Sequence, residues 1–275
     1  MSTSRATLTV SIVVYRPDVE RFFQTLHSLR DAVCAVRRRD PNFHAAICVV
    51  DNGGTPDIWK NVIESNVAGF ECSSLGGHGN VGYGRGHNLA IAEAGSEHHL
   101  ILNPDIDLDE NALVHALSFM NGRPDVGLLT PYISDEKGGI QYLCRRSPAM
   151  LDLLIRGFFP AGWKARFVER LARYEMRDVI NDHDIVDNPP IVSGCFMLFR
   201  TEVLKKLGGF DPRYFLYFED YDLSLRTHEI ARVAYVPSVR VVHHGGGASR
   251  KGFAHIRMFA ASAFKFYNRF GWRLW

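Results

Sequence analysis

The sequence has few of the features that mark secreted, membrane-spanning or nucleic-acid-binding proteins. Its five cysteines are scattered along 275 residues without a Cys-x-x-Cys pair, which favours a reduced cytoplasmic compartment over a disulfide framework. Lys and Arg number 32 against 30 Asp and Glu, so no broad positive surface for nucleic acid is expected. The apolar run that starts at residue 8 is too short for a signal peptide or a membrane span. We therefore expect a cytoplasmic protein that binds no nucleic acid.

Several well-known catalytic motifs are also missing. The chain has no Gly-x-Ser-x-Gly elbow, no P-loop and no His-Glu-x-x-His sequence. It has no internal repeat or low-complexity tract, and with 46% hydrophobic residues it can bury a full core. The residues left for chemistry are carboxylates, histidines and glycine-rich turns.

Strand-like and helix-like segments alternate along the chain, which favours a mostly parallel sheet covered by helices. Apolar β-branched runs predict strands or strand-to-turn segments at 8–15, 45–54, 98–105, 191–199 and 232–244. Apolar residues at helical spacing predict helices at 19–33, 55–65, 111–120, 202–207 and 252–275, and a glycine-rich loop entering a helix at 79–95. The basic, helix-prone stretch 144–187 predicts an insertion or lid.

Two of the predicted strands end in an aspartate, Asp51 and Asp105. In open sheets of this kind, ligands bind beyond the carboxyl ends of the strands. A strand-end Asp can accept a hydrogen bond from the imide N–H of uracil or thymine, while the Asn-Gly-Gly that follows Asp51 lets the backbone turn beside it. The same sequence is ordinary turn chemistry, so both interpretations of Asp51 stay open.

The glycine-rich segment 76–88 also contains Arg85 and Asn88. Glycines let backbone N–H groups approach a diphosphate, and the N-terminus of the following helix adds a favourable dipole. The glycine spacing does not match the dinucleotide fingerprint, because the last offset is missing. The loop therefore fits a phosphate better than NAD.

Further carboxylates and two histidines stand at strand ends. Asp105 can hold a hard divalent cation, with a structural role as the equal alternative. We expect Asp107 and Asp109 to cap the helix that follows. His243 and His244 face opposite ways on a strand, so at most one of the two joins a given site, and a structural role is the alternative.

A cluster of carboxylates follows an aromatic run in 216–226. An unpaired charge is costly beside apolar walls, so the cluster is either the polar start of a helix or contains a proton acceptor. Asp222 and Arg226 have the i,i+4 spacing of a helix-stabilising pair. The local sequence does not choose between Glu219 and Asp220 as the proton acceptor.

The order of these motifs is more specific than any one of them. The series resembles glycosyltransferase family 2, particularly the bacterial rhamnosyltransferase-like branch that assembles cell-surface polysaccharides, over about residues 10–249. The motifs that carry the resemblance are VVDNGG, GNVGYGRGHN, LILNPD, VSGCFMLFR, LGGFDPRYF, FEDYDLSLR and HHGGGAS.

The resemblance implies a single domain of the α/β class with a GT-A fold, which has a Rossmann-like, mostly parallel central sheet flanked by helices. Residues 8–143 would form the nucleotide-sugar-binding half and 144–187 a helical insertion. Residues 188–250 would form the acceptor and catalytic half, and 251–275 a C-terminal amphipathic helix. A nucleotide-sugar donor, Mg²⁺ or Mn²⁺, and inversion at the anomeric carbon are implied as well.

The resemblance also assigns residues on the donor side. Asp51 would bind the nucleobase, and Asn80, Gly82, Arg85 and Asn88 would line the nucleotide-sugar pocket.

For the metal, the resemblance assigns Asp105 and a late histidine. The usual Asp-x-Asp is represented by Asn103-Pro104-Asp105, so one acidic ligand is missing and the metal requirement is open. His243 best matches the histidine, with His244 as the register alternative.

On the acceptor side, Asp220 would be the general base, taking the proton of the acceptor hydroxyl as it attacks the anomeric carbon. Glu219 would orient or bind the acceptor, and Ser193 and Gly194 would form part of its wall.

The predicted function is therefore inverting sugar transfer onto a saccharide or polyprenyl diphosphate-linked acceptor in O-antigen or related polysaccharide assembly. L-Rhamnose from dTDP-L-rhamnose is the first choice of donor, and UDP-galactofuranose and UDP-glucose are alternatives. A nucleotidyltransferase would share the nucleotide pocket but need no base at Asp220. The acids at Asp105 and Asp220 disfavour a non-catalytic nucleotide-sugar-binding protein.

The C-terminal helix mixes aromatic and basic residues. This composition suits the face of an anionic membrane, where peripheral contact with the inner membrane would bring the enzyme to a lipid-linked acceptor. The equal alternative is a helix packed on the core with Arg and Lys reaching outward.

Overall fold

The structure is a computed structural model, and it describes residues 7–54, 59, 70–245 and 252–275. Apart from Trp59, the helix expected at 55–65 lies outside the described residues, as does the end of the expected turn at 246–249. Within the described ranges, no helix has the length and apolar character needed to cross a membrane.

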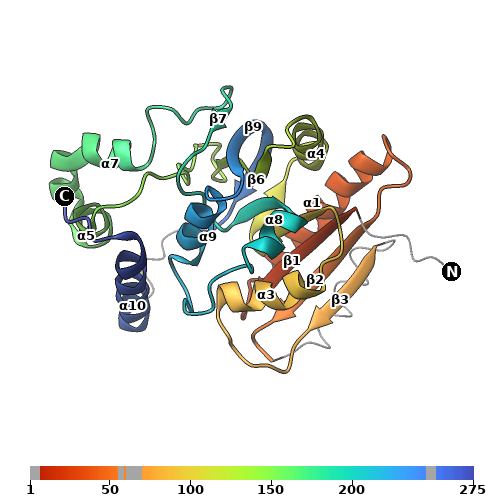
Figure 1. Ribbon diagram of the computed structural model, residues 1–275, viewed down its shortest axis with the longest axis horizontal. Helices are drawn as coiled ribbons and strands as arrows, with labels where there is room; N and C mark the ends of the chain where they lie inside the picture. Colours follow the sequence, from red (N-terminus) through yellow and green to blue (C-terminus); the bar gives the residue numbers. More distant parts are fainter. Residues whose placement is uncertain (1–6, 55–58, 60–69, 246–251) are drawn as a thin grey trace.

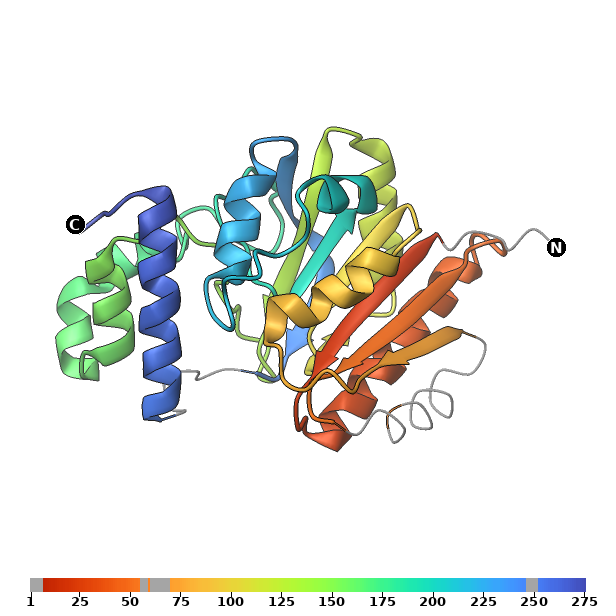
Figure 2. The same ribbon diagram turned by 60° about the horizontal axis from the view of Figure 1, so that its bottom comes forward.

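The first half of the chain forms four parallel strands in the order β3-β2-β1-β4. They are β1 (Leu8–Val14), β2 (Ala45–Asp51), β3 (Glu71–Leu75) and β4 (His98–Leu102). Side chains of β1 alternate between the two faces of the sheet: Val14 packs in the main core with α1 (Val19–Arg37) and α4 (Ala112–Gly122), whereas Val13 packs against Ala90 of α3 (Tyr83–Glu93). Helices therefore cover this part of the sheet on both sides (Figures 1 and 2).

The second half extends the sheet from β4 in the order β8-β6-β9-β5, with β7 paired to β9. The added strands are β5 (Ile106–Leu108), β6 (Val126–Ser134), β7 (Val186–Asp187), β8 (Phe196–Arg200) and β9 (Arg232–His243). β6 and β9 are parallel, whereas β8 runs antiparallel to both β4 and β6. The predicted parallel sheet is thus confirmed around β1, and the direction changes at β8.

The basic stretch 144–187 is largely helical, as predicted, and packs with the C-terminal helix. Its helices are α5 (Met150–Phe158), α6 (Ala161–Lys164), the 3₁₀ turn η1 (Ala165–Phe167) and α7 (Val168–Tyr174), and the C-terminal helix is α10 (Phe253–Phe270). Figures 1 and 2 show α5, α7 and α10 together at the end of the molecule away from β3. Their shared core contains Leu153, Tyr174, Tyr214, Phe218, Phe266 and Tyr267.

Two short helices complete the fold, α8 (Thr201–Lys206) and α9 (Glu219–Thr227). Leu223 of α9 is buried in a core that includes strands β6, β8 and β9, whereas Tyr221 and Leu225 pack into the core of α5, α7 and α10. α9 therefore joins the sheet to the helical end of the molecule, and its acidic N-terminus lies at the junction.

Candidate active site

The turn after β2 is tied to the neighbouring strand and to the glycine-rich loop. Asp51 is 1% exposed, and its Oδ1 accepts a hydrogen bond from the N–H of Gly53 at 2.6 Å. The backbone N–H of Asn52 donates to the carbonyl of Val14 at 2.9 Å, and its side-chain amide donates to the carbonyl of Gly82 at 3.1 Å. Asp51 thus lies at the carboxyl edge of the sheet beside the loop, and its contact with a nucleobase stays a prediction.

The glycines at the start of α3 allow close packing. A Cβ on Gly82 would lie 2.2 Å from the carbonyl oxygen of Phe215, and one on Gly84 would lie 2.7 Å from Cβ of Phe210. Gly82 also has φ +91°, which disfavours a side chain there. Asn80 is exposed, and its Oδ1 accepts from the N–H of Gly82 at 3.0 Å. The loop is therefore held against the segment that precedes α9.

Arg85 and Asn88 of α3 bind that same segment. Asn88 donates its amide to the carbonyl of Phe210 and accepts from the N–H of Phe210, both at 2.8 Å. Arg85 is exposed, and its Nε donates to the carbonyl of Pro212 at 2.5 Å. Both side chains position the segment, and their expected contact with the donor stays a prediction.

Asp105 and His243 come together beyond the ends of β4 and β9. His243 Nε2 lies 3.7 Å from Oδ1 of Asp105, and this oxygen is buried without a hydrogen-bond partner among the described residues. Gly245 keeps the space beside them open, because a Cβ there would lie 2.4 Å from Oδ2 of Asp105 and 2.5 Å from Nε2 of His243. An orphaned carboxylate oxygen and a ring nitrogen facing one space are a chemically suitable pair of ligands for Mg²⁺ or Mn²⁺.

The tautomer of His243 is set by Gln141. The Gln141 amide N–H donates to the carbonyl of His243 at 2.9 Å, so its Oε1, 2.9 Å from Nδ1 of His243, is an acceptor. Nδ1 therefore carries the proton, which leaves the lone pair of Nε2 directed toward Asp105. Burial lowers the pKa of His243 despite the nearby Asp105, which keeps the ring neutral and able to bind a cation. Among the described residues, no group of three His, Cys, Asp or Glu could hold a metal, so further ligands would come from substrate or water.

His244 faces a different set of acids. Its Nε2 lies 2.7 Å from Asp107 and its Nδ1 lies 2.8 Å from Glu136. The expectation that Asp107 caps the following helix is therefore wrong, because β5 continues through Asp107 and pairs it with the end of β9. Asp109 accepts from the N–H of Asn111 at 2.9 Å and so shapes the turn before α4, in which Asn111 is the capping residue.

Asp220 is held by two backbone donors at the start of α9. Its Oδ2 accepts from the N–H of Gly194 at 3.0 Å, and its Oδ1 accepts from the N–H of Tyr221 at 2.9 Å. Burial raises the pKa of Asp220, and these hydrogen bonds oppose the rise by stabilising the carboxylate. The preceding Tyr217 and Phe218 both have left-handed backbones, with φ of 71° and 66°, a strained geometry that is often found at functional sites.

Glu219 has a different environment from its neighbour. It is 5% exposed, and its Oε2 has no hydrogen-bond partner in the described part of the chain. Burial, with a smaller contribution from the charge of Asp220, raises its pKa to about 8. At neutral pH, Glu219 is therefore protonated and can donate a hydrogen bond, whereas Asp220 has the donors that support an ionised base.

The Glu219→Gln variant should be more stable than the wild type at pH 8 and lose this advantage as the pH falls. The pKa of Glu219 is raised from 4.5 to about 8 on folding, so the unfolded chain releases its proton first and wild-type stability falls as the pH rises between these values. We expect an advantage of at least about 1 kcal/mol in the free energy of unfolding at pH 8, measured by urea titration. A difference that is the same at pH values of about 5 and 8 would contradict the raised pKa.

The segment Ser193–Cys195 connects the strand end before Asp105 to the acids of α9. The carbonyl of Cys195 accepts from the N–H of Asn103 at 2.9 Å, and Gly194 donates to Asp220. Tyr83, the first residue of α3, donates its hydroxyl to the carbonyl of Gly194 at 2.6 Å. The donor-side loop, the strand end before Asp105 and the proposed base are thus joined through one short segment.

A cavity of about 420 Å³ opens beside the acids of α9. Its walls come from α5, α10, the start of α9 and connecting segments that include Arg145 and Ser193, and are mainly aromatic and aliphatic with two arginines. The polar side chains on the walls include Arg145, Arg156, Ser193, Glu219 and Asp220. The cavity lies against the predicted base. Ser193 lines it and Gly194 does not, and the contact of both residues with an acceptor stays a prediction.

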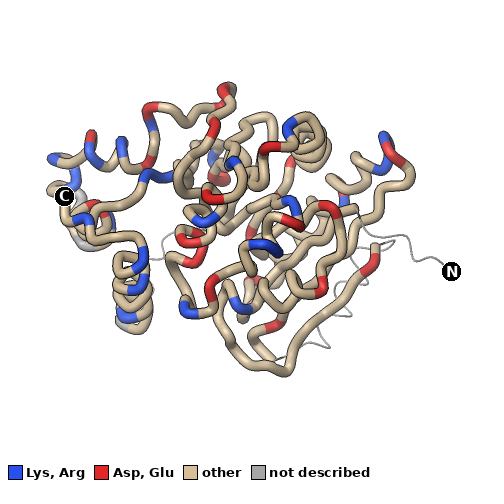
Figure 3. The backbone as a smooth tube through the Cα atoms, in the orientation of Figure 1, with Lys and Arg blue, Asp and Glu red and all other residues tan. Residues whose placement is uncertain are grey.

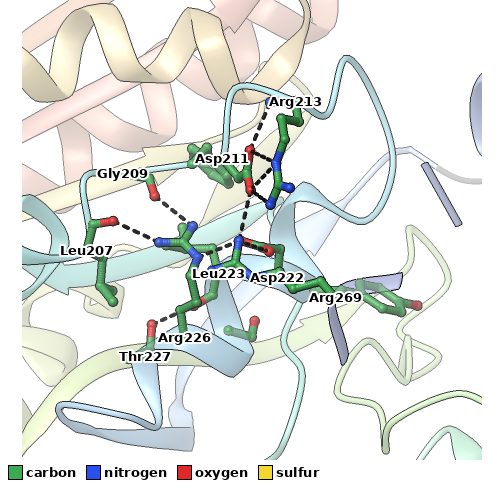
Figure 4. A network of polar contacts seen from close by, with 12 residues as sticks. Leu207, Gly209, Asp211, Arg213, Asp222, Leu223, Arg226, Thr227 and Arg269 are labelled. Atoms are coloured by element: carbon green, nitrogen blue, oxygen red, sulfur yellow. Dashed lines mark hydrogen bonds and ion pairs between the residues drawn. The ribbon is translucent and has the colours of Figure 1, made fainter. Parts of the chain in front are cut away.

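Asp222 and Arg226 form the expected pair within α9 and extend it into a larger network (Figure 4). Arg226 Nε lies 2.5 Å from Asp222 Oδ1, and its Nη atoms donate to the carbonyls of Leu207 and Gly209 at 2.9 and 2.8 Å. Arg269 of α10 lies 2.9 Å from the other oxygen of Asp222. The network holds α9 against the preceding loop and α10.

Replacing Arg226 by Met should destabilise the fold by about 2–4 kcal/mol, because it leaves the fully buried Asp222 with one fewer cation and frees two carbonyls. The matched control is Arg213→Met, which removes an arginine that is 61% exposed and should cost under about 1 kcal/mol. Urea unfolding measures both changes. If both variants lost the same free energy of unfolding, the buried network would contribute no more to stability than the exposed ion pair of Arg213.

The comparisons with known proteins agree with this geometry. Residues 131–267 match the family model described as "Glycosyltransferase like family 2". The chain is 27% identical over 236 residues to rhamnosyltransferase WbbL of Escherichia coli K12, covering 82% of this chain and 83% of that protein. The chain is similar to glycosyltransferase family 2.

Other relatives cover this chain less completely. It is 28% identical over 182 residues to an N-acetylglucosaminyl-diphospho-decaprenol L-rhamnosyltransferase of Mycobacterium tuberculosis, covering 60% of this chain and 56% of that protein. The match thus spans little more than half of the mycobacterial relative.

Solved structures of glycosyltransferases share the fold of this protein. The mannosyltransferase PcManGT of Pyrobaculum calidifontis, solved with GDP-Man and Mn²⁺, has a TM-score of 0.59 at 18% identity and covers 95% of this chain and 65% of that one. GalNAc-T7, solved with UDP, GalNAc and Mn²⁺, has a TM-score of 0.61 at 14% identity and covers 88% of this chain and 44% of that one. The expected GT-A fold is confirmed.

Several side chains that shape the site could not be singled out from the sequence alone. Gln141 fixes the tautomer of His243, and Tyr83 holds Gly194. Arg145 lies in the predicted basic stretch, so its charge was visible, but its burial in the cavity wall was not. Gln141 and Tyr83 have no local sequence signal, because their partners are about a hundred residues away in the chain.

Proposed function

We propose that the protein transfers a sugar from a nucleotide sugar to a hydroxyl of a saccharide or lipid-linked acceptor, with inversion at the anomeric carbon. The observation that carries the proposal is the position of Asp220. Through Gly194 and Cys195 it connects to the strand end before Asp105, and on its other side it lines the 420 Å³ cavity. A base between a donor site and an acceptor cavity is the arrangement that a direct displacement requires.

In this reaction the acceptor hydroxyl lies in the cavity within hydrogen-bond reach of Asp220. Asp220 takes the hydroxyl proton while the oxygen bonds to the anomeric carbon, and the bond from that carbon to the nucleoside diphosphate breaks. The proton ends on Asp220, and the leaving group takes the electron pair of the broken bond. Glu219, protonated at neutral pH, can donate a hydrogen bond to another acceptor oxygen and so orient the sugar.

The donor side would use the residues at the carboxyl ends of β2, β4 and β9. Asp51 would accept the imide N–H of the nucleobase, with Asn80 and Gly82 beside the donor. Asp105 and His243 would hold Mg²⁺ or Mn²⁺, which supplies positive charge to neutralise the diphosphate leaving group. Two solved structures with the same fold contain Mn²⁺, which supports this assignment.

For the donor sugar we propose L-rhamnose from dTDP-L-rhamnose, in O-antigen or related cell-surface polysaccharide assembly. The names of two relatives support this choice, since both are rhamnosyltransferases. The mycobacterial name also supports a polyprenyl diphosphate-linked acceptor. UDP-galactofuranose and UDP-glucose are the alternative donors.

The test is a panel of nucleotide sugars offered with a polyprenyl diphosphate-linked N-acetylglucosamine acceptor. The proposal expects release of nucleoside diphosphate that depends on acceptor, fastest with dTDP-L-rhamnose. If nucleoside diphosphate were released fastest with another donor, that donor would replace dTDP-L-rhamnose in the proposal, and the proposed sugar transfer would stand. Release of pyrophosphate would favour nucleotidyl transfer, and no turnover with any donor would contradict the proposed activity.

We also propose peripheral contact with the cytoplasmic face of an anionic membrane. Figure 3 shows basic and no acidic residues along α10, and Phe264, Trp272 and Trp275 at this end of the chain are 58%, 49% and 85% exposed. Exposed aromatics beside basic residues suit a lipid headgroup region. The protein should sediment with phosphatidylglycerol vesicles, and a Phe264→Ala/Trp275→Ala variant should do so about tenfold less. Equal sedimentation of both proteins would contradict the contact.

A further inference from the structure

One wall of the acceptor cavity contains a buried arginine with incomplete hydrogen bonding. The side chain of Arg145 is 6% exposed, and its Nη1 has no hydrogen-bond acceptor among the residues that the structure describes. Its backbone is fixed by hydrogen bonds in both directions with Ile191, at 2.8 and 3.1 Å. A guanidinium stays protonated in proteins, so a full positive charge lies at the cavity wall.

The nearby carboxylates do not balance the positive charge at this wall. Glu175 Oε1 lies 3.8 Å from Nη1 of Arg145 and 3.6 Å from Nε of Arg156, while its Oε2 accepts from Arg177 at 2.6 Å. One carboxylate is thus shared by three arginines. Asp220 adds one negative charge farther along the wall, but both of its oxygens already accept backbone N–H groups.

Arg156 gives the wall a second, more accessible cation. Its side chain is 44% exposed, and it lines the cavity from α5. Phe218, Phe259 and Ile256 form apolar parts of the same cavity. The cavity therefore offers a proton acceptor at Asp220, two guanidinium groups, and apolar surface, all within reach of a single ligand.

We propose that Arg145 and Arg156 form a subsite for the phosphate groups of the acceptor, a sugar joined through a diphosphate to a lipid chain. This inference rests on the proposed sugar transfer and adds where the acceptor is held. The planar guanidinium fork matches phosphate oxygens bidentately, and the unsatisfied Nη1 of Arg145 gains an acceptor when the phosphate binds. The sugar next to the diphosphate then lies toward Asp220, and the first part of the lipid chain lies on the apolar wall.

A binding measurement tests the subsite without any sugar transfer. Geranyl diphosphate and geraniol share an apolar chain and differ in the diphosphate, and calorimetric titration in EDTA prevents a cation from drawing the diphosphate to Asp105. The wild type should bind geranyl diphosphate more tightly than geraniol. Arg145→Gln and Arg156→Gln should each weaken geranyl diphosphate binding about tenfold and leave geraniol binding unchanged, since each removes a charged hydrogen-bond donor.

The matched control is Arg166→Gln, which removes an arginine of the same helical region that does not line the cavity. It should bind geranyl diphosphate like the wild type. Because Arg145 is buried, its variant is accepted only if its thermal unfolding matches the wild type, and the more exposed Arg156 supplies the second variant. Equal binding of geraniol and geranyl diphosphate, or wild-type binding by the Arg156 variant, would overturn the subsite. Neither result bears on donor turnover, so the subsite and the proposed function fail separately.

Discussion

The Asp220→Asn variant should lose about 10²–10⁴-fold in kcat, because an amide cannot accept the proton of the acceptor hydroxyl. Its KM for the nucleotide sugar should stay near the wild-type value, since Asp220 lines the cavity proposed for the acceptor. The amide keeps the shape of the side chain but replaces one of the two oxygens that accept backbone N–H groups. Thermal unfolding of the variant should therefore be measured as well, to show that the variant is folded. The release of nucleoside diphosphate gives kcat and KM.

Glu219→Gln is the matched control for this loss. Glutamine resembles the protonated acid that a pKa of about 8 maintains at neutral pH, so this variant should stay within about tenfold of wild-type kcat. The two acids are neighbours in the chain and both line the cavity. If Glu219→Gln were the inactive variant and Asp220→Asn the active one, the base would be Glu219.

Removal of divalent cation should abolish turnover, and Mg²⁺ or Mn²⁺ should restore it. Asp105→Asn and His243→Ala should each raise the cation concentration needed for half-maximal rate by at least about tenfold, because each removes one of the two proposed protein ligands. Titration of activity with Mn²⁺ measures the change. Wild-type turnover in EDTA would contradict the assignment of a cation to this pair.

Asp107→Asn tests whether the effect is specific to the Asp105–His243 pair. Asp107 is two residues from Asp105 but contacts His244 instead of His243. Its replacement should leave the cation dependence unchanged. A rise equal to that of Asp105→Asn would show that general charge near the strand ends, and not the Asp105–His243 pair, determines cation binding.

The positions of the strand ends could be predicted because they depend on local patterns. Apolar β-branched runs ending in Asp51 and Asp105 marked the two strands β2 and β4, and parallel pairing of each with β1, which lies between them, brought their ends to one edge. The alternation of adjacent residues also predicted that His243 and His244 would separate. Which of the two meets Asp105 depended on pairing between β5 and β9, in which Ile106 pairs with His243.

Other features could not be predicted, because they depend on contacts between residues that are far apart in the sequence. The glycines at the start of α3 predicted a phosphate-binding loop. In the structure, Gly82 and Gly84 pack against a segment about 130 residues later in the chain. β6 was missed because Gly127 and Pro131 interrupt its apolar pattern, although neighbours on both sides bury it. Asp107 was predicted to cap a helix because the short strand β5 has no pattern of its own. In each case a tertiary contact outweighed the local preference.

The anomeric configuration of the product tests the central claim most directly. If Asp220 acts once as a base and the acceptor displaces the nucleoside diphosphate in one step, the new glycosidic bond must have the configuration opposite to that of the donor. The one-bond coupling between the anomeric carbon and its hydrogen in the purified product distinguishes the two configurations. Inversion is the predicted result; retention would require a covalent or double-displacement route and would contradict the assigned role of Asp220.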